Sequence, residues 1–384
     1  MSTQIRIAET EAEKEAIYKF RYSIYVDELG KHLKYANHTE KRLCDDTDYS
    51  ATHFFVKHES EIIASLRIHL GQQVESDSHQ NQLIERFSLH QFAPYEFSHF
   101  SFTSRLMISS KWRNQNILGK LLLDGYRYLR THGVLFDFCH ARPALVPIYE
   151  HLGYLRYKRN IIDESGYQIP LTLITNNVDY FKSIRSIFSI PAKKFSNSTT
   201  HNQWFSSTFN TSSRVMASAF ANAEDFWSYL ISRLNFTEIH LFDGLSEEES
   251  QKFIQIGNII QCKEGEKIVQ KGEVGDELFL VLEGLVEVVG KLDHKQFTIA
   301  NFEKGELFGE MAFISNTPRS ADIVAVSDLE LLVFSRNHLE KSLKTHPAII
   351  ARVLLNIARV LSERLRISTH NWLASESKHI RDQQ

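Results

Sequence analysis

Cysteine is scarce in this chain, as are the patterns that accompany secretion, membrane insertion and metal binding. The 384 residues include three widely spaced cysteines, Cys44, Cys139 and Cys262, which argue against a disulfide framework and favour a reducing compartment. Residues 1–20 are rich in Glu and Lys, so no signal peptide is expected. No apolar run approaches a membrane span, and neither HExxH nor CxxC spacing occurs. We therefore predict a cytoplasmic protein without a metal site.

The chain also lacks a strong excess of charge. Its 44 Lys and Arg residues and 47 Asp and Glu residues give a net charge of −3 at pH 7. This balance implies no strong affinity for polyanions, so no nucleic acid partner is expected. Hydrophobic residues make up 42%, enough for ordinary globular cores, and the length predicts two or three domains.

One stretch of biased composition marks a boundary between domains. Residues 195–214 are rich in Ser, Thr and Asn and show neither a helical nor a strand period, which predicts a linker over 186–214. Trp204 and several Phe suggest that part of it docks on a domain. The periodicity of the next residues predicts a helix over 215–235. We expect a first domain at 1–185, a second at 236–370 and a polar tail at 371–384.

The most informative stretch is FGEMAFISNTPRSADIVA at 308–325, among glycine-punctuated alternating strands. A carboxylate and a guanidinium inside an apolar barrel each need a partner. Arg319 offers a planar fork of donors suited to phosphate, and Ser320 adds a hydroxyl donor. Gly309 and the residues after it can present backbone N–H groups at the start of a short helix. Glu310 can accept a hydrogen bond from a sugar hydroxyl. The alternative is an ordinary Arg–Glu pair without a ligand.

This stretch closely resembles the phosphate-binding cassette of the cyclic nucleotide-binding domain family, in particular its catabolite-activator type. The resemblance implies a β jelly-roll barrel with flanking helices, in which Glu310 binds the ribose and Arg319 and Ser320 bind the cyclic phosphate. Arg-Ser-Ala favours cAMP over cGMP. The implied binding residues in the cassette are Gly309, Glu310, Met311, Ala312, Arg319, Ser320 and Ala321.

The flanking segments extend this resemblance. Ser246 and Glu249 form the pattern of a capping box before a helix. Pro347 opens a long helical pattern with an apolar face made by Ile350, Leu354, Ile357, Leu361 and Leu365. The resemblance implies a lid helix over 347–369, with Ser368 and Thr369 touching the base. Its Leu354 and Leu361 suggest a homodimer, although its Arg-rich flank could equally stay solvated. Because the chain stops at Gln384, too soon for a helix-turn-helix, we expect the output to lie N-terminally and no DNA partner.

The first domain reads as mixed α/β. We predict strands at 53–58, 61–70, 101–109 and 134–140, and helices at 9–29, 116–132 and 146–154. Two last strands are expected around 155–162 and 170–175. Strands and helices in this order give a partly parallel sheet. The predicted fold class is therefore α+β, with a mixed α/β sheet domain followed by a jelly roll.

Several phrases resemble the GNAT acyltransferase fold, most closely the branch of N-acyl amino acid synthases and acyl-homoserine-lactone synthases. They are RYSIYVDELG at 21–30, DDTD at 45–48, SLRI at 65–68, SRLMI at 104–108 and PIYEHLGYLRY at 147–157. The resemblance implies transfer of an acyl group from a CoA or acyl-carrier-protein thioester to an amine, with an amino acid as the expected acceptor. It assigns Tyr149 to protonation of the leaving thiolate; simple packing is the alternative. The charged cluster that would orient the acceptor, or merely brace loops, is Arg21, Asp45, Asp48, Arg67 and Arg105. The implied acyl-donor site contains Met107, Ile108, Arg113, Asn116 and Gly119.

Two departures from that family bear on catalysis. The donor's pyrophosphate normally rests on R-x-x-G-x-G, but Asn116 and Leu118 replace both glycines here. The synthase branch has a Glu where this chain has Phe102, which can act neither as a base nor as a ligand. We predict a bacterial, cAMP-regulated N-acyltransferase in which ligand closes the lid helix. The alternatives are a non-catalytic GNAT-like binding module under cAMP control and a cAMP-regulated protein lysine acetyltransferase.

Overall fold

A computed structural model describes residues 5–29, 33–74, 77–113, 116–163, 166–195, 200–209, 230, 239–273, 275–292, 295–315 and 317–382. The chain divides into two compact units by its internal contacts. The first comprises residues 1–160 and 168–214, and the second comprises residues 161–167 and 215–384. The exact domain boundaries proposed from the sequence stay a prediction.

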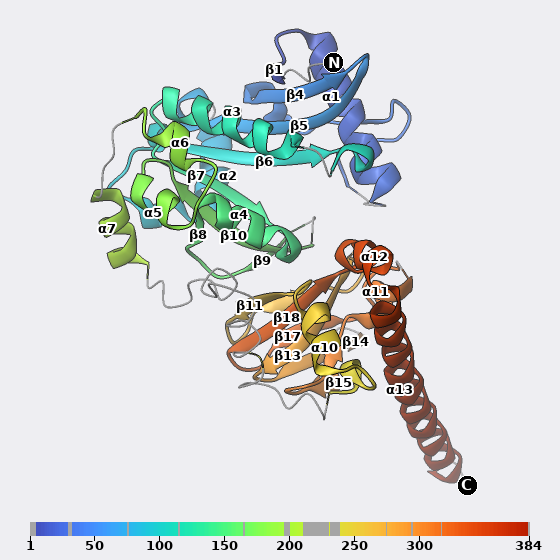
Figure 1. The fold of residues 1–384 in the computed structure, drawn as a ribbon. Coiled ribbons are helices and arrows are strands. Elements are labelled where there is room, and N and C mark those ends of the chain that lie inside the picture. Colours follow the sequence, from blue (N-terminus) through green and yellow to red (C-terminus); the bar gives the residue numbers. More distant parts are fainter. Residues whose placement is uncertain are drawn as a thin grey trace. The chain divides into compact units, whose positions relative to one another are not determined.

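The first unit is built on one twisted sheet with the strand order β1-β4-β5-β6-β7-β10-β8 (Figure 1). Among the described pairs of this sheet, β6 and β7 run parallel and the others that are registered run antiparallel. The mixed α/β class predicted from the sequence is therefore confirmed. The strands of this unit are β1 (Ile5–Ile7), β4 (Thr52–His58), β5 (Glu61–Leu70), β6 (Phe100–Ile108), β7 (Phe136–Ala141), β8 (Tyr154–Arg156) and β10 (Gly166–Ile174). The short strand β9 (Ile161–Asp163) and the first two residues of β10 belong to the second unit.

Helices lie against this sheet, and α3 packs against β4, β5 and β6. The helices are α1 (Glu11–Tyr22), α2 (Asp77–Phe87), α3 (Ile117–Thr131), α4 (Val146–Leu152), α5 (Val178–Ser183), α6 (Ser189–Ala192) and α7 (Thr200–Thr208). A short pair of strands, β2 (Ala36–Asn37) and β3 (Arg42–Leu43), follows a π-helical turn at Ser23–Glu28. The elements predicted between residues 53 and 154 are confirmed to within two residues. Helix α2 was not predicted, because its first half is polar and only Leu83, Ile84 and Phe87 mark its buried side.

Part of the expected linker is helical. Helix α7 lies within 186–214, and its Trp204 and Phe205 pack into an aromatic cluster with Phe92, Phe136 and Phe138. The Ser and Thr residues of this segment hid the helix because they are weak helix formers that also occur in loops. Burial of these large rings stabilises the helix where its propensity does not. The suggestion that part of the segment docks is therefore confirmed, whereas the absence of regular structure is wrong for 200–208.

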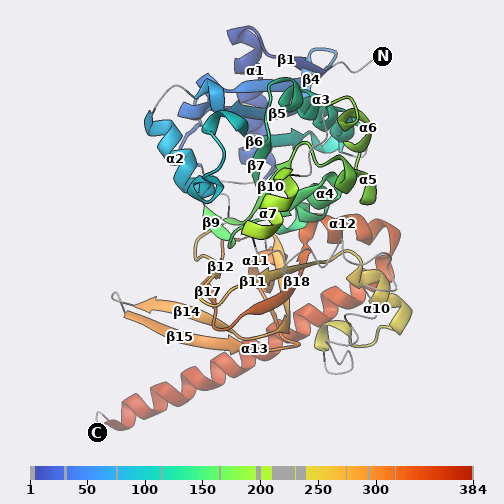
Figure 2. The ribbon, with the colours of Figure 1, turned by 90° about the vertical axis from the view of Figure 1, so that its left-hand side faces the viewer.

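The second unit contains two facing β-sheets with the orders β11-β18-β13-β16 and β12-β17-β14-β15, as expected for a jelly roll (Figure 2). Helix α10 (Glu247–Ile254) begins with the predicted capping box of Ser246 and Glu249. The strands are β11 (Asn258–Cys262), β12 (Lys267–Val269), β13 (Glu277–Glu283), β14 (Val286–Leu292), β15 (Lys295–Phe302), β16 (Leu307–Phe308), β17 (Asp322–Ala325) and β18 (Leu329–Ser335). The remaining helices are α11 (Glu310–Ser315), α12 (Arg336–Thr345) and α13 (Pro347–Asp382).

Helix α13 packs its first turns on the core of the second unit and then runs on past the barrel (Figure 1). Ile350 and Ile357 are buried, and Leu354 and Leu361 pack against the same core. The predicted end at 369 is wrong: the helix continues to Asp382, since no Pro or Gly interrupts 370–382. The predicted helix at 215–235 lies outside the described residues apart from Leu230, which is buried in that core. No described helix is both long and apolar enough to cross a membrane.

Candidate functional sites

The cassette of the second unit is shaped around the guanidinium of Arg319. Gly309 adopts a φ of 83°, and a Cβ at this position would lie 2.7 Å from Arg319 Nη1. A Cβ at Gly275 would lie 2.5 Å from Arg319 Nε. Both positions therefore need glycine, because any side chain would displace the guanidinium. Arg319 is buried, and its guanidinium also lies 5.6 Å from the centre of the Phe279 ring.

Arg319 and Glu310 do not pair with each other in the structure. Arg319 donates to the backbone carbonyls of Gly309 and Glu277, and it forms an ion pair of 3.2 Å with the Glu277 carboxylate. Glu310 instead forms an ion pair of 2.8 Å with Arg364 on α13. The sequence analysis offered an Arg319–Glu310 ion pair as the alternative to a ligand. In the structure each of these two buried charges is instead neutralised by a separate charged side chain.

The other cassette residues surround this pair of charges. Ala312 is buried, whereas Met311 is largely exposed and lies 3.7 Å from the Ser320 hydroxyl, which points to its sulfur. Ser320 is exposed and Ala321 is partly buried. Ser368 and Thr369 lie within α13 on its exposed surface, and the Thr369 hydroxyl donates to the carbonyl of Leu365. The expectation that these two hydroxyls stand at a helix end is therefore wrong.

Sequence reasoning missed Glu277 and Arg364. Arg364 holds α13 on the cassette through Glu310, through a 2.6 Å hydrogen bond to the carbonyl of Leu307, and by stacking 4.3 Å from the ring centre of Phe302. The sequence did contain a signal for Arg364. It lies one helical turn before Ser368, a residue already expected near the nucleotide, so both should face the same side of the helix. Glu277 had no local signal, since its proximity to Arg319 comes from the pairing of distant strands.

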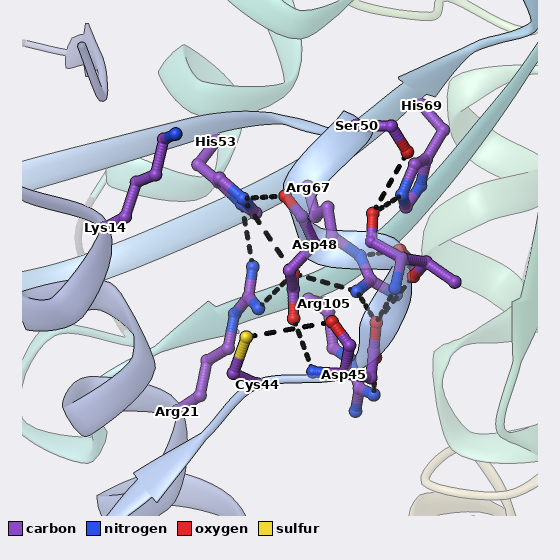
Figure 3. Close-up of polar contacts among 12 residues, drawn as sticks. Lys14, Arg21, Cys44, Asp45, Asp48, Ser50, His53, Arg67, His69 and Arg105 are labelled. Carbon is purple, nitrogen blue, oxygen red and sulfur yellow. Dashed lines mark hydrogen bonds and ion pairs between the residues drawn. The ribbon is translucent and has the colours of Figure 1, made fainter. Parts of the chain in front are cut away.

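In the first unit, the charged residues singled out from the sequence form one buried network (Figure 3). Arg21 on α1 pairs with Asp48 at 2.6 Å and donates to His53 Nδ1 at 2.9 Å. Because a guanidinium can only donate, His53 Nδ1 is the acceptor and Nε2 carries the proton that it donates to the Asp48 carbonyl. Arg21, Asp48 and His53 are each 1% exposed, so this part of the network is shielded from water.

Asp45 joins the network to Arg67 and Arg105. Arg67 Nη1 lies 2.7 Å from Asp45 and 2.9 Å from Asp48, and Arg105 Nη2 lies 2.7 Å from the other Asp45 oxygen. Arg105 sits at a bulge of β6 with a φ of 53°, a conformation that costs energy for a residue with a side chain. The bulge turns Arg105 towards Asp45 and between the rings of Tyr25 and Tyr35, whose centres lie 5.3 and 5.1 Å away.

The network carries more positive than negative charge. Burial, reinforced by the Arg21 guanidinium, lowers the pKa of His53 to about 4, and burial likewise lowers the pKa of His69 to about 3. Both imidazoles are therefore neutral at pH 7. Burial alone would raise the pKa of Asp48, but the Arg67 and Arg21 guanidiniums reduce it to about 2. Three guanidiniums thus face two carboxylates, which leaves one positive charge uncompensated among these five groups.

Breaking this network is expected to lower the free energy of unfolding of the first unit. In the full chain, Asp48→Ala leaves Arg21 without its carboxylate, and removal of one partner from a buried ion pair costs about 3–5 kcal/mol. Denaturant unfolding should show this loss in the transition of the first unit. Asp124→Ala, which breaks the exposed pair of Asp124 with Arg127, should leave stability nearly unchanged. Equal losses for the two variants would contradict a buried, energetically coupled network.

Tyr149 lies on α4 and is buried. The helix ends at Gly153, whose φ is 114° and whose added Cβ would lie 2.5 Å from the Phe181 ring. Burial raises the pKa of Tyr149 well above its usual range, and the nearby Cys139, Asp137 and Tyr25 groups raise it further. The Tyr25 ring also lies 5.3 Å from the Arg105 guanidinium. No hydrogen bond to the Tyr149 hydroxyl is found among the residues that the structure describes.

The expected acyl-donor residues are placed less favourably. Arg113 donates to the carbonyl of Ile108 and pairs with the carboxylate of Glu28, so its guanidinium is engaged within the protein. Met107 and Ile108 are buried in apolar clusters. Asn116 precedes α3 without a side-chain cap, and its Oδ1 would lie 2.9 Å from a Cβ at Gly119. Within the described residues, no group of His, Cys, Asp and Glu is placed to hold a metal ion.

Two family models match the chain. Residues 20–123 match an acetyltransferase (GNAT) domain, and residues 259–346 match a cyclic nucleotide-binding domain. The chain therefore contains a GNAT acetyltransferase domain and a cyclic nucleotide-binding domain. The first match includes Arg21, Asp45, Asp48, Arg67 and Arg105 but ends before Tyr149, and the second includes the whole cassette.

Curated relatives match the second unit. The cyclic AMP receptor protein of Thermus thermophilus is 35% identical over 130 residues, which cover 33% of this chain and 57% of the relative. The cAMP-dependent protein kinase regulatory subunit of Mycosarcoma maydis is 31% identical over 88 residues, covering 23% of this chain and 17% of the relative. The chain thus spans little more than half the length of the first relative and less than a fifth of the second.

Solved structures resemble the same region. A cyclic nucleotide-binding domain from Methylobacillus flagellatus shares 29% identity with a TM-score of 0.36, covering 39% of this chain and 85% of that one. The catabolite activator protein of Thermus thermophilus shares 33% identity with a TM-score of 0.32, covering 35% of this chain and 61% of that one.

Proposed function

We propose that this protein is an N-acyltransferase controlled by cAMP and that its acceptor is an amine that carries a carboxylate. The observation that carries the proposal is the buried cluster of three guanidiniums and two carboxylates. An excess positive charge in a shielded site attracts an anionic group on the substrate. An amino acid offers such a carboxylate beside its amine, whereas the side chain of a protein lysine does not.

The chemistry expected of Tyr149 is proton donation. When the amine attacks the thioester, the C–S bond breaks and the departing sulfur needs a proton. A phenol whose pKa is raised well above its usual range keeps its proton at pH 7, so Tyr149 is available as the donor. The donor is an acyl thioester of CoA or of acyl carrier protein. The engaged Arg113 and the absent glycines favour acyl carrier protein, because its phosphopantetheine arm carries no ADP group and so needs no pyrophosphate site.

Control would pass through α13. A cyclic nucleotide bound with its ribose at Glu310 and its phosphate at Arg319 meets the same carboxylate that Arg364 uses to hold this helix. Ligand binding therefore changes the contacts of α13. Coupling of two sites requires about 1–3 kcal/mol of differential binding. Helix α13 is also the proposed surface of a homodimer, through its exposed apolar residues Leu355, Leu365, Ile367 and Leu373. The residues suggested by the sequence, Leu354 and Leu361, pack against the core of the second unit instead.

The test of this function is an acyl-transfer assay on the full chain. Long-chain acyl carrier protein and acyl-CoA serve as donors, and free amino acids serve as acceptors, with and without cAMP. The matched control acceptors are the corresponding amino acid amides, which keep the amine but lack the carboxylate. We expect transfer to the amino acids, at least a tenfold preference over the amides, and a rate that changes with cAMP. Equal rates with and without cAMP would defeat the regulatory part, and no transfer to any acceptor would defeat the enzymatic part.

The role of Arg364 gives a separate prediction. Arg364→Ala removes the cation that a bound ribose must displace from Glu310, so cAMP binding should become tighter, by up to about tenfold for one charge-assisted hydrogen bond. It should also reduce the effect of cAMP on the acyl-transfer rate. Arg366→Ala is the matched control, because Arg366 lies on the same helix and pairs only with exposed Glu363 among the described contacts. If both variants bind cAMP and respond to it like the unmodified protein, α13 does not transmit the signal through Glu310.

A second function is favoured by the pairing of Arg113 with Glu28 and by Leu118 in place of glycine. Both features weaken a nucleotide site, so the first unit could be a non-catalytic module that binds an acylated molecule under cyclic nucleotide control. Calorimetric titration with long-chain acyl-CoA and with acyl carrier protein separates the two functions. Binding without turnover, in the presence of the amino acid acceptors, supports the binding module.

A further inference from the structure

The parallel strands of the first unit, β6 and β7, separate after a short stretch of pairing, and we call this separation the fork. Strands β6 and β7 pair at Ser101 with Asp137 and at Phe102 with Phe138, and no registered pair follows, although β6 continues to Ile108 and β7 to Ala141. Asp137 therefore lies at the base of the fork. On the other side of β7 it pairs with Leu173 of β10, which in turn pairs with Tyr154 of β8. Residues that pair side by side across a sheet form one rung, and their side chains project from the same face. Asp137 and Tyr154 therefore lie on one face of the sheet.

Asp137 is a fully buried carboxylate held by hydroxyl groups. Its Oδ1 accepts hydrogen bonds from Ser101 at 2.6 Å and from Thr103 at 2.9 Å, and its Oδ2 accepts one from the Tyr154 hydroxyl at 2.5 Å. None of the described cations pairs with it. An acidic side chain in an otherwise apolar strand is costly, since burial without a cation disfavours the charged form. Packing alone would be better served by an apolar residue at this position.

The groups around Asp137 define when it can carry charge. Burial raises its pKa to about 6, although the hydroxyls of Ser101, Tyr154 and Thr103 lower it in part. The titratable groups facing it are Cys139 on its own strand, Tyr154 on β8 and Tyr149 on α4. Burial raises the pKa of each of these three well above its usual range, so they remain neutral near pH 6. Asp137 is therefore the group of this cluster that changes charge around pH 6.

We infer that Asp137 and Tyr154 form a proton-accepting pair for acyl transfer, in which Tyr154 takes a proton from the attacking amine and passes its own proton to Asp137. This inference rests on the proposed function. The rings of Tyr149 and Tyr154 meet edge to face with centres 5.2 Å apart, so the proposed proton donor and proton acceptor are neighbouring side chains. Asp137 acts through Tyr154 and is a positioning residue in this scheme.

The proton balance of the step is complete. The amine nitrogen forms a bond to the thioester carbon and loses one proton to the Tyr154 oxygen, while the Tyr154 proton moves to Asp137 Oδ2. The C–S bond breaks, and the sulfur takes the Tyr149 proton. Afterwards Tyr154 recovers its proton from Asp137, and the proton released from the amine reaches Tyr149 through solvent. The net reaction converts a thioester and an amine into an amide and a thiol.

This arrangement supplies a base that the sequence appeared to lack. Phe102 occupies the position at which the resembling branch has a Glu, and it pairs in the sheet with Phe138. Asp137 lies one residue before Phe138 and so stands on the adjacent rung of the neighbouring strand. Side chains of adjacent rungs project from opposite faces of the sheet, so the Asp137 carboxylate lies on the other face from Phe102.

The experiment measures acyl transfer by the full chain as a function of pH for the unmodified protein, Tyr154→Phe, Asp137→Asn and Tyr157→Phe. Tyr157 is the matched control, because its hydroxyl is also buried on the same part of the chain but donates to the carbonyl of Phe87. We expect Tyr154→Phe to lower kcat about a hundredfold with little change in KM. Tyr157→Phe should stay within about threefold, and denaturant unfolding reports whether each variant is folded.

The ratio of the unmodified rate to the Asp137→Asn rate removes the titration of the acceptor amine, which is common to both. Because the carboxylate must be ionised to accept a proton, this ratio should be constant above about pH 7 and fall about tenfold per unit below pH 6. A flat ratio, or a Tyr154→Phe variant that is folded and fully active, overturns the inference. Absence of transfer by the unmodified protein refutes the proposed function itself and is thereby distinguished from failure of this pair.

Discussion

Replacing Arg319 by Gln is expected to weaken cyclic nucleotide binding at least about a hundredfold. A guanidinium donates two or more charge-assisted hydrogen bonds to a phosphate, each contributing about 1.5–3 kcal/mol. Since about 1.4 kcal/mol corresponds to a tenfold change in affinity, the loss of two such bonds exceeds a hundredfold. Calorimetric titration of the full chain with cAMP measures the effect, and titration with cGMP reports the preference between the two nucleotides.

A matched control is available because Arg319 has a protein partner. Glu277→Gln disrupts the same ion pair from the other side while leaving the guanidinium in place between Gly309 and Gly275. This variant should bind cAMP within about tenfold of the unmodified protein, since the phosphate ligand itself is retained. Retention of full affinity by a folded Arg319→Gln variant would show that the guanidinium serves only to brace β13 against the cassette.

The second large effect is expected from Tyr149→Phe, which removes the proton donor for the leaving sulfur. General acid catalysis contributes about 10²–10⁴-fold to a rate. The loss should appear in kcat with little change in KM, because the hydroxyl assists the departing group rather than substrate binding. Steady-state kinetics with an amino acid acceptor measures both constants.

The variant Tyr126→Phe controls for removal of a buried hydroxyl. Tyr126 is buried in the same unit, and its hydroxyl donates to the carbonyl of Thr175 at 2.7 Å, away from the charged cluster. A modest loss of stability and a nearly unchanged kcat are expected from it. A Tyr149→Phe enzyme as active as the Tyr126→Phe enzyme would assign Tyr149 to packing and would leave the thiolate to be protonated by another group.

The two large predictions differ in how far the sequence alone led to them. The cassette around Arg319 could be predicted because its determinants are local: one glycine, a proline and a short helix within a few residues. The strands and helices between residues 53 and 154 were predicted for the same reason, since their periodicities of apolar residues are clear. Helices α2 and α7 were missed because polar sequences gave no period and tertiary burial of a few aromatic rings decided their conformation.

The charged cluster was predicted only in part: the sequence indicated its members but not how they pair. Residue types and phrase order indicated that Arg21, Asp45, Asp48, Arg67 and Arg105 belong together. The order of pairing among them did not follow from the sequence, because it depends on the bulge at Arg105 and on the approach of α1 to β4 and β5. Asp137 carried a weak signal, as an acidic residue in an apolar strand, but its hydroxyl partners come from β6 and β8.

The amino-acid sequence by itself indicated the two domain families, singled out Arg319 as the candidate phosphate ligand and predicted most of the regular elements, because these depend on residues close together along the chain. Only the tertiary structure decided which charge neutralises which: Glu277 for Arg319, Arg364 for Glu310, and hydroxyl groups rather than a cation for Asp137. The physical reason is that the free energy of a buried charge depends on what lies within a few ångströms of it. Those neighbours come from strands and helices that are distant in the chain.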